Sequence, residues 1–244
     1  YLDIAGGTLL DVYGGANNSH VRKATNILVN YKDSEAIAKT DLIPAVQKII
    51  RGQEVKYNIN RLFGGNNQMD MTIQPEWQLK KGSVGSVYGG CNKSDAVIYN
   101  EEGDSNLHPD TTVKAGLVLN LDYPDFSAAN VFGGCRMGNV HTRKIEDGKP
   151  VNVVLANNQY GTIIKVRAGK YGRIFGGNDV SGRIYNGTHV LLEGGEINEV
   201  FGAGNGEYIY QYSPDVNEIT ECYDPDAKMY YYKIPASPDY EGAY

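Results

Sequence analysis

A polar segment near the middle of the chain holds the densest group of carboxylates. Glu101, Glu102, Asp104 and Asp110 all fall within residues 101–110. Clustered carboxylates on an exposed strand perform acid, base or nucleophilic steps in polysaccharide lyases and glycoside hydrolases, and grouped carboxylates also bind calcium. We favour a solvated acidic loop here, with weak calcium binding as the next alternative. We expect Asp104 and Asp110 to contact a ligand, and we assign no catalytic residue.

Tyrosines are the second group of side chains suited to recognition, because tyrosine offers a large amphipathic surface at a small loss of conformational entropy. Residues 208–244 are rich in tyrosine and proline, unlike the segments before them. They form either half-ordered hairpins that cover the last repeat or an exposed contact surface. We expect ligand contacts at Tyr160, Tyr208, Tyr210 and Tyr212.

Other kinds of chemistry lack their sequence signatures. The chain has no GxxxxGK[ST] phosphate loop, no GxSxG nucleophile elbow and no CxxC zinc motif. The histidines, His20, His108, His141 and His189, are scattered, and three of them lie beside inserts or turns, where a solvated histidine is common. We therefore expect neither a resident metal nor a cofactor, and we lean against catalysis.

The elements that must position these residues are repeats. A phrase made of an aliphatic residue, an aromatic residue and Gly-Gly or Gly-Ala occurs six times, with the aromatics 50, 25, 44, 43 and 26 residues apart. A bare unit of 25 or 26 residues, lengthened by inserts, explains these intervals. The copies contain Tyr13-Gly14-Gly15, Phe63-Gly64-Gly65, Tyr88-Gly89-Gly90, Phe132-Gly133-Gly134, Phe175-Gly176-Gly177 and Phe201-Gly202-Ala203.

The flanks of the phrase predict its structure. Apolar residues alternate with polar ones before the aromatics, as in the pairs Leu2/Ile4 and Val190/Leu192, which is typical of short strands. Glycine pairs fit sharp corners, and Asn or Asp four residues after most of the aromatics predicts a ladder of turn side chains. One repeat cannot bury its own apolar face, so the copies must stack, at about 4.8 Å per layer. The six aromatics should then form one column.

Two cysteines share one position of the repeat. Cys91 and Cys135 each stand three residues after an aromatic. In adjacent layers they would stack, either as two small buried thiols, which we favour, or as a disulfide.

The repeated [VIL]-[YF]-G-[GA]-x-[ND] phrase resembles the Gly-Gly-Asn repeats of functionally uncharacterised surface and secreted proteins of gut Bacteroidetes. The resemblance covers roughly residues 1–209. It implies an extracellular protein with a right-handed parallel β-helix of the pectin-lyase-like type, and it implies no settled activity. We predict an all-β fold, a single-stranded right-handed parallel β-helix (β-solenoid) with coils of about 25 residues.

The intervals between repeats predict the domain organisation. Residues 1–209 should form the β-helix, with inserts near 31–52, 94–110 and 141–161, and residues 210–244 a C-terminal cap or tail. An acidic segment that starts near Ser34, spaced apolar residues up to Ile50 and the following Gly52 predict a helical insert, either one helix or two short ones divided before Pro44. A hairpin of 151–155 with 162–166 is expected in the third insert. The chain opens inside a repeat, so we expect it to be part of a longer polypeptide.

Charge and hydropathy narrow the range of partners. The net charge of −6 disfavours nucleic acid and anionic membranes as partners, and no apolar run approaches the roughly 20 residues of a membrane span. We expect an extracellular or outer-surface segment, structural and adhesive, that binds a glycan or a host or bacterial surface protein through its inserts and tail. The alternative function is a polysaccharide lyase or glycoside hydrolase of the β-helix type.

Overall fold

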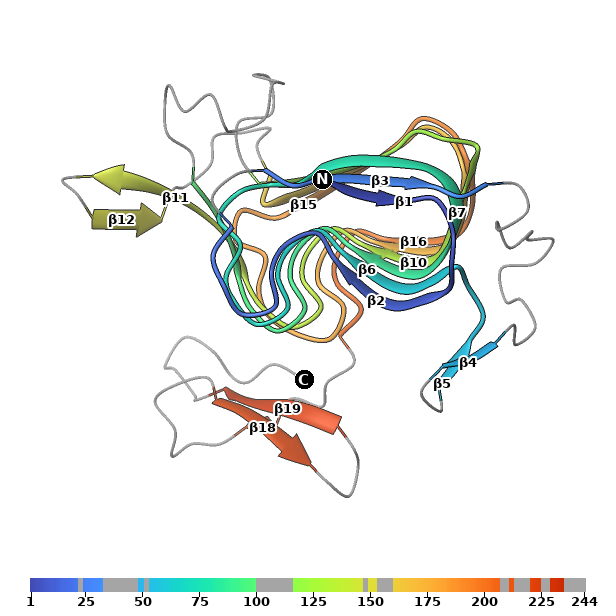
Figure 1. Ribbon diagram of the computed structural model, residues 1–244. Helices are drawn as coiled ribbons and strands as arrows, with labels where there is room; N and C mark the ends of the chain where they lie inside the picture. Colours follow the sequence, from blue (N-terminus) through green and yellow to red (C-terminus); the bar gives the residue numbers. More distant parts are fainter. Residues whose placement is uncertain are drawn as a thin grey trace. The chain divides into compact units, whose positions relative to one another are not determined.

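The chain folds as strands and turns. The computed structural model describes residues 1–21, 24–32, 48–50, 53–99, 116–146, 149–152, 160–206, 211–212, 220–224 and 229–234 (Figure 1). These residues contain no helix, which confirms the prediction of an all-β fold for them. The chain divides into two compact units, Tyr1–Asn205 and Gly206–Tyr244.

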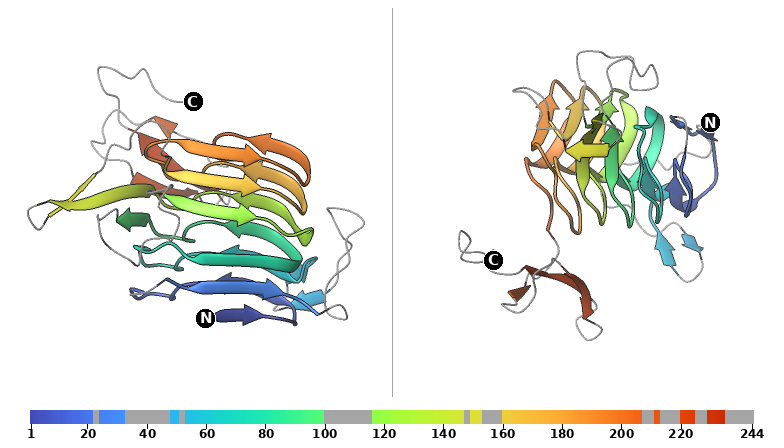
Figure 2. Two further views of the ribbon diagram at one scale, coloured as in Figure 1. Left: turned by 90° about the horizontal axis from the view of Figure 1, so that it is seen from above. Right: turned by 90° about the vertical axis from the view of Figure 1, so that its left-hand side faces the viewer.

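The first unit is a stack of six layers. Each layer has a strand on a first side and an earlier strand of the chain on a second side. Figure 2 shows the layers following one another from the N-terminal strands onward. In the third layer one long strand, β7 (Glu76–Tyr88), covers both sides. The other layers are β1 (Leu2–Ile4) with β2 (Leu9–Tyr13), β3 (Asn26–Asn30) with β6 (Ile59–Phe63), β9 (Leu117–Leu121) with β10 (Asp125–Phe132), β13 (Thr162–Val166) with β14 (Lys170–Phe175), and β15 (Thr188–Leu192) with β16 (Glu196–Phe201).

On the first side the strands pair in parallel, and the repeated phrase sets their register. Tyr13 lies opposite Phe63, Phe63 opposite Tyr88, and Tyr88 opposite Phe132. Phe132 and the last two aromatics continue the same register. Parallel pairing follows because the chain returns to the same edge of the sheet once per repeat. The predicted single column of aromatics is confirmed.

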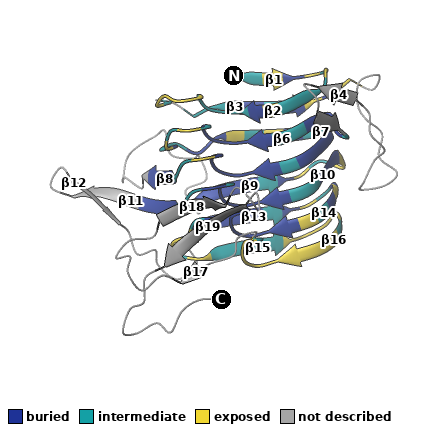
Figure 3. Cartoon of the chain, turned by 90° about the horizontal axis from the view of Figure 1, so that it is seen from below, coloured by how far each residue is buried: buried dark blue, intermediate teal, exposed yellow. Residues whose placement is uncertain are grey.

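On the second side the alternating apolar residues point into the stack. Ile164 and Val166 of β13 are fully buried and align with Leu119 and Leu121 of β9. They belong to one continuous core that lies between the first and second sides and extends through all six layers. Figure 3 shows this core as buried residues in the middle layers, with more exposure in the last layer. Stacking therefore buries an apolar face that no single repeat could bury alone.

A third side follows the glycine corners. Here β8 (Ala96–Tyr99) pairs in parallel with β11 (Val140–Glu146), and single bridges join Met71 to Ala96 and Val140 to Ile184. Beyond this side, β11 turns back as a hairpin with β12 (Lys149–Asn152). The hairpin predicted between 151–155 and 162–166 is therefore wrong, because residues 162–166 pair in parallel with the neighbouring layers and leave β11 as the partner of β12.

The helix predicted for Ser34–Ile50 is wrong at its end. Lys48–Ile50 form strand β4, which pairs antiparallel with β5 (Gln53–Val55). Two adjacent β-branched isoleucines and a two-residue connection that ends in Gly52 favour a tight hairpin over a last helical turn. The rest of the predicted helix lies outside the described residues.

The second unit has its own small sheet. Strand β19 (Met229–Ile234) pairs antiparallel with β18 (Thr220–Asp224) and in parallel with β17 (Gln211–Tyr212).

Candidate functional site

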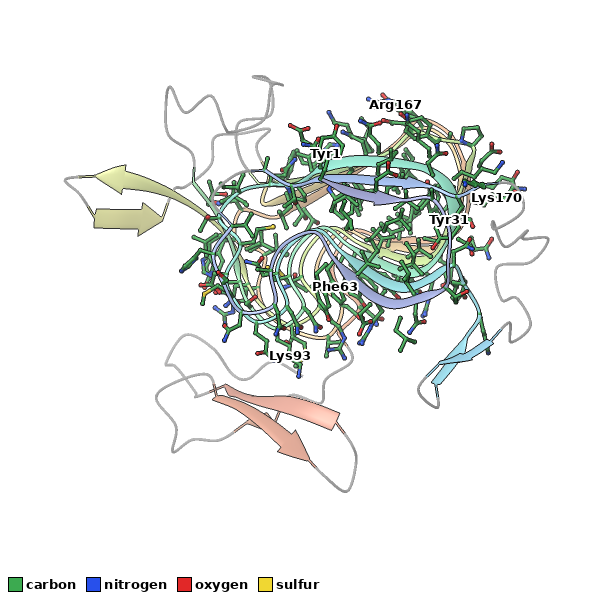
Figure 4. The ribbon with its side chains drawn as sticks, in the orientation of Figure 1. Tyr1, Tyr31, Phe63, Lys93, Arg167 and Lys170 are labelled. Carbon is green, nitrogen blue, oxygen red and sulfur yellow. The ribbon has the colours of Figure 1, made fainter. Side chains whose placement is uncertain are left out.

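The repeat positions are used for stacking, which removes them from the list of candidate site residues. The aromatic rings of successive layers lie 4.5–5.0 Å apart between centroids and nearly parallel. Phe63, Tyr88, Phe132 and Phe175 are almost completely buried. In Figure 4, Phe63 lies among the stacked ribbons, whereas Lys93 and Arg167 lie at the outer margin.

Asparagines four residues after the aromatics form an outer ladder of side-chain hydrogen bonds. Nδ2 of Asn67 donates to Oδ1 of Asn17 at 2.7 Å, and Nδ2 of Asn92 donates to Oδ1 of Asn67 at 2.7 Å. Arg136, which breaks the sequence pattern, continues the ladder by donating from Nη1 to Oδ1 of Asn92 at 3.4 Å. At the far end, Asn205 donates to Asp179 at 3.1 Å. The predicted turn ladder is confirmed.

Tyrosines of the aromatic column also bond to this ladder. The hydroxyl of Tyr88 donates to Oδ2 of Asp179, two layers away, at 2.8 Å, and Nδ2 of Asn92 donates to the hydroxyl of Tyr13 at 3.3 Å. Burial, together with the negative charge of Asp179, raises the pKa of Tyr88 far above its ordinary value. Tyr88 is therefore a neutral structural donor.

Three residues after the aromatics, an inner ladder satisfies backbone amides. Oδ1 of Asn66 accepts the Ala16 amide at 2.7 Å, and Oδ1 of Asn178 accepts the Cys135 amide at 2.8 Å. Between them, Sγ of Cys135 accepts the Cys91 amide at 3.2 Å. Both cysteines are buried free thiols, so the favoured alternative is confirmed. Burial raises the pKa of the Cys135 thiol, which makes it a poor nucleophile.

The best candidate site is a group of aromatic side chains at the corner between the second and third sides. We call it the Tyr–His patch: His141, Tyr160, Tyr185 and His189. The rings of His141 and Tyr185 stack with centroids 4.4 Å apart, and those of Tyr160 and His189 lie 4.7 Å apart. Tyr185 is 40 % exposed, and Tyr160 and His189 are partly exposed.

Backbone hydrogen bonds across adjacent layers bring the two ring pairs of the Tyr–His patch to this corner. The Tyr185 amide donates to the Val140 carbonyl at 3.0 Å, which places Tyr185 beside His141. The Gly161 amide donates to the Gly187 carbonyl at 2.9 Å, which brings Tyr160 to the same corner. A Cβ at Gly161 would clash with the Tyr185 carbonyl oxygen, so this close approach requires glycine.

A carboxylate orients His141. Oδ2 of Asp95 lies 3.2 Å from Nε2 of His141, and Oδ1 of Asp95 accepts the Asn139 amide at 2.7 Å. His141 is 8 % exposed, and within the described ranges its buried Nδ1 has no hydrogen-bond partner. In the described part of the chain no thiol or hydroxyl hydrogen-bonds to His141. The arrangement is suited to binding a polar ligand that also offers an apolar face.

The structure places only one of the predicted ligand contacts in this patch. Tyr160 is there. Asp104, Asp110, Tyr208 and Tyr210 lie outside the described residues, and Tyr212 belongs to β17, where only the backbone is described.

Sequence reasoning missed three members of the Tyr–His patch, His141, Tyr185 and His189. After the glycine corner the fifth layer contains one more residue than the fourth. The bridges of Met137 to Ser181 and of Val140 to Ile184 show this shift. Tyr185 therefore stands ten residues after its aromatic, and His141, beside it, stands nine after. Alignment of the columns on the aromatics hides the pair. The only available signal was that His141 and His189 adjoin inserts or turns.

Within the described residues, no three His, Cys, Asp or Glu side chains gather where a metal ion could bind, and no helix could cross a membrane. No protein-family model, curated protein or solved structure matches the chain.

Proposed function

We propose that residues 1–205 form a right-handed, single-stranded parallel β-helix that serves as a rigid stalk segment of an extracellular adhesive protein of a bacterial surface. Parallel pairing on the first, second and third sides supports the β-helix. The right hand follows from the strong preference of parallel crossover connections for that hand. An exposed stalk needs no further binding partners along its length, because each layer is stabilised by its neighbours.

The adhesive function that the geometry supports best is glycan binding at the Tyr–His patch. One observation carries it: the repeated aromatics of the four inner layers are buried in the stack, whereas Tyr185 stacks on His141 and stays 40 % exposed. A partly exposed tyrosine ring offers an apolar surface to the CH face of a sugar, and its hydroxyl and nearby polar groups bond to sugar hydroxyls. Asp95 and Asn139 lie next to His141 and supply such groups.

Binding without turnover is the form of this function that the site favours. His141 has a carboxylate on Nε2, but no thiol or hydroxyl of the described residues bonds to it, and Cys91 and Cys135 are buried. A catalytic pair of carboxylates would have to come from residues 101–110, which lie outside the described residues.

A polysaccharide-binding screen with single variants tests this function. We expect the wild type to bind at least one glycan on a panel of plant, mucin and bacterial polysaccharides. Tyr185→Ala and Tyr160→Ala should each weaken that binding by about tenfold, the effect of losing roughly 1.4 kcal/mol of ring contact. The matched control is Tyr1→Ala, because Tyr1 is 94 % exposed and belongs to the first layer, far along the stack from the patch.

Two results would count against the proposal. Equal binding by the wild type and both patch variants would remove the Tyr–His patch from the function. Chain cleavage that Asp104→Asn or Asp110→Asn abolishes would establish the polysaccharide lyase or glycoside hydrolase instead.

A further inference from the structure

One exposed arginine beside the Tyr–His patch has no acceptor for its guanidinium. The other arginines with described side chains each bond to an acceptor in a neighbouring layer; they are Arg61, Arg136, Arg167 and Arg173. Arg183 is exposed, and its backbone amide donates to Oδ1 of Asn139 at 2.9 Å. Within the described residues its side chain makes no hydrogen bond or ion pair, so the guanidinium is available to a ligand.

Arg183 and Tyr185 point to the same outer face of the third side. The Val140 amide donates to the Arg183 carbonyl at 2.8 Å, and the Tyr185 amide donates back to Val140 at 3.0 Å, so this segment is extended alongside β11. Between them, Ile184 packs inward against the buried residues of the third side. In an extended segment alternate side chains share a face, with Cα atoms about 7 Å apart. A guanidinium and a partly exposed ring therefore stand side by side.

A polar column of the third side ends at Arg183. Asp70, Asp95 and Asn139 occupy this column in successive layers. Each accepts through Oδ1 the backbone amide of the column residue in the next layer, at 2.7–3.0 Å. A guanidinium has no acceptor, so Arg183 cannot continue the series. The two carboxylates of the column are thus bonded to protein amides, whereas its one cation has no such bond.

We propose that the glycan bound at the Tyr–His patch carries an acidic group, which Arg183 binds while the sugar ring packs against Tyr185. This inference rests on the glycan binding proposed above and names the class of glycan. Arginine presents parallel N–H groups that match the paired oxygens of a carboxylate, and sulfate oxygens accept the same bonds. Arg183 is then the residue that sets specificity, and Tyr185 supplies the ring contact that any sugar would use.

The charge of the whole chain limits how acidic the glycan is. A net charge of −6 repels a polymer that carries a negative charge on every sugar. A single acidic group that reaches Arg183 gains a direct contact while the rest of the glycan stays uncharged. The ligand is therefore a mainly neutral glycan with isolated acidic sugars.

Paired ligands test the acidic group. Glucuronoxylan is compared with the same polymer after reduction of its carboxylates to alcohols, and sulfated mucin glycans are compared with their desulfated form. We expect the wild type to bind at least one acidic form about tenfold more tightly than its neutral counterpart, and Arg183→Gln to bind the two forms equally. The two arms show whether the acidic group is a carboxylate or a sulfate.

The matched control is Arg173→Gln, because Arg173 is an exposed arginine of the same layer on the first side. It should keep the preference for the acidic form. Arg183 is exposed, so Arg183→Gln should keep the fold, and circular dichroism verifies this for every variant.

Several results would overturn the proposal. They are equal binding of acidic and neutral forms by the wild type, a preference that survives Arg183→Gln, and an equal loss of preference in Arg173→Gln. Tighter binding of polygalacturonate than of glucuronoxylan would overturn the limit on charge density.

Tyr185→Ala separates this inference from the function on which it rests. It should weaken the binding of both forms and leave their ratio unchanged. Binding that Tyr185→Ala weakens but that shows no acidic preference would leave glycan binding standing and remove the role of Arg183. Failure of the wild type to bind any glycan would remove both.

Discussion

At the scale of single residues, the stack is held by hydrogen bonds whose donors and acceptors sit in different layers. Asn66, Cys135 and Asn178 do the same task, since each accepts a backbone amide of the layer before it. A thiol can replace the amide oxygen at this position because its sulfur can still accept a hydrogen bond, although weakly, and because the thiol is small and suited to burial. At these three positions the acceptor can therefore be an amide oxygen or a thiol sulfur.

Two buried tyrosines differ in whether their hydroxyl has a partner, and this gives the first prediction. The hydroxyl of Tyr88 donates to Asp179, whereas that of Tyr171 is buried and has no hydrogen-bond partner among the described residues. An unpaired buried hydroxyl destabilises the fold, so Tyr171→Phe should raise the free energy of unfolding by about 1 kcal/mol near neutral pH. Tyr88→Phe, the matched control, should lower it by about 1 kcal/mol or more. Chemical denaturation measures both, and a change of the same sign in the two variants would contradict the explanation.

The burial of Tyr171 also predicts how the stability of the fold depends on alkaline pH. Burial, with a smaller effect of Asp122, raises the pKa of Tyr171 above its unfolded value near 10. The neutral phenol is thus favoured in the fold. The contribution of the neutral Tyr171 phenol to the free energy of unfolding is fully present below about pH 10. As the pH rises further, the free energy of unfolding falls by up to about 1.4 kcal/mol per pH unit. The free energy of unfolding of Tyr171→Phe should therefore exceed that of the wild type by more at pH 11 than at pH 9, which are about one unit above and below the ordinary pKa of tyrosine. A difference that stays constant over this range would contradict the prediction.

At the scale of elements, the glycine corner lets the layers approach each other. Gly89 and Gly133 follow the aromatics of the third and fourth layers, and a Cβ on either would overlap the carbonyl oxygen of the equivalent glycine in the next layer. That oxygen belongs to the backbone and cannot move without shifting the layer. Glycine is required here by contact between layers, whereas Gly82 and Gly169 are required by a positive φ.

A glycine-to-alanine series tests this account of the corners. Gly89→Ala and Gly133→Ala should each lower the free energy of unfolding by at least about 2 kcal/mol. Gly202→Ala is the matched control from the last copy of the phrase, where a Cβ would meet no atom within 4 Å. That change should be neutral or stabilise by up to about 1 kcal/mol, because it restricts the unfolded chain. Urea denaturation measures the free energy of unfolding of each variant. An equal decrease in all three variants would show that the close approach of the layers is not why glycine is needed at these corners.

The elements also show how far the sequence alone predicts the structure. The aromatic column, the corners and the Asn ladder could be predicted, because each depends on residues at a fixed distance from Tyr13, Phe63 and their equivalents. Lys48–Ile50 were mispredicted as helix because spaced apolar residues over three positions do not separate a strand from a helical turn. The pairing of His141 with Tyr185 could not be predicted, since it depends on one extra residue between two layers.

At the scale of the whole first unit, stability should vary along the stack. The described strands of the stack pair between adjacent layers, and side chains such as Tyr88 bond across two layers, so a middle layer is held from two directions and an end layer from one. The middle strands β7 and β10 contain mainly buried residues, whereas nearly every residue of β16 is exposed. Opening should therefore begin at the ends, and the core layers should open last.

Hydrogen exchange followed by mass spectrometry tests this gradient. Amides of β7, β10 and β14 should exchange slowest, and those of β1 and β16 should exchange faster by at least about a hundredfold, the effect of roughly 3 kcal/mol in opening free energy. Uniform protection across the six layers would show that the unit opens as one cooperative block.

The unbroken column of rings has a consequence for measuring distance. The rings of the third and fourth layers belong to residues 44 apart in sequence, and those of the fifth and sixth to residues 26 apart, yet both pairs of centroids lie 4.7–5.0 Å from each other. The length along the axis thus depends on the number of layers and not on the number of residues between them. In the first unit, a loop between two strands can therefore be lengthened, deleted or exchanged while the spacing of the layers along the axis stays the same. Natural variation, or a protein engineer, can therefore change what is displayed at a given height without changing the height itself.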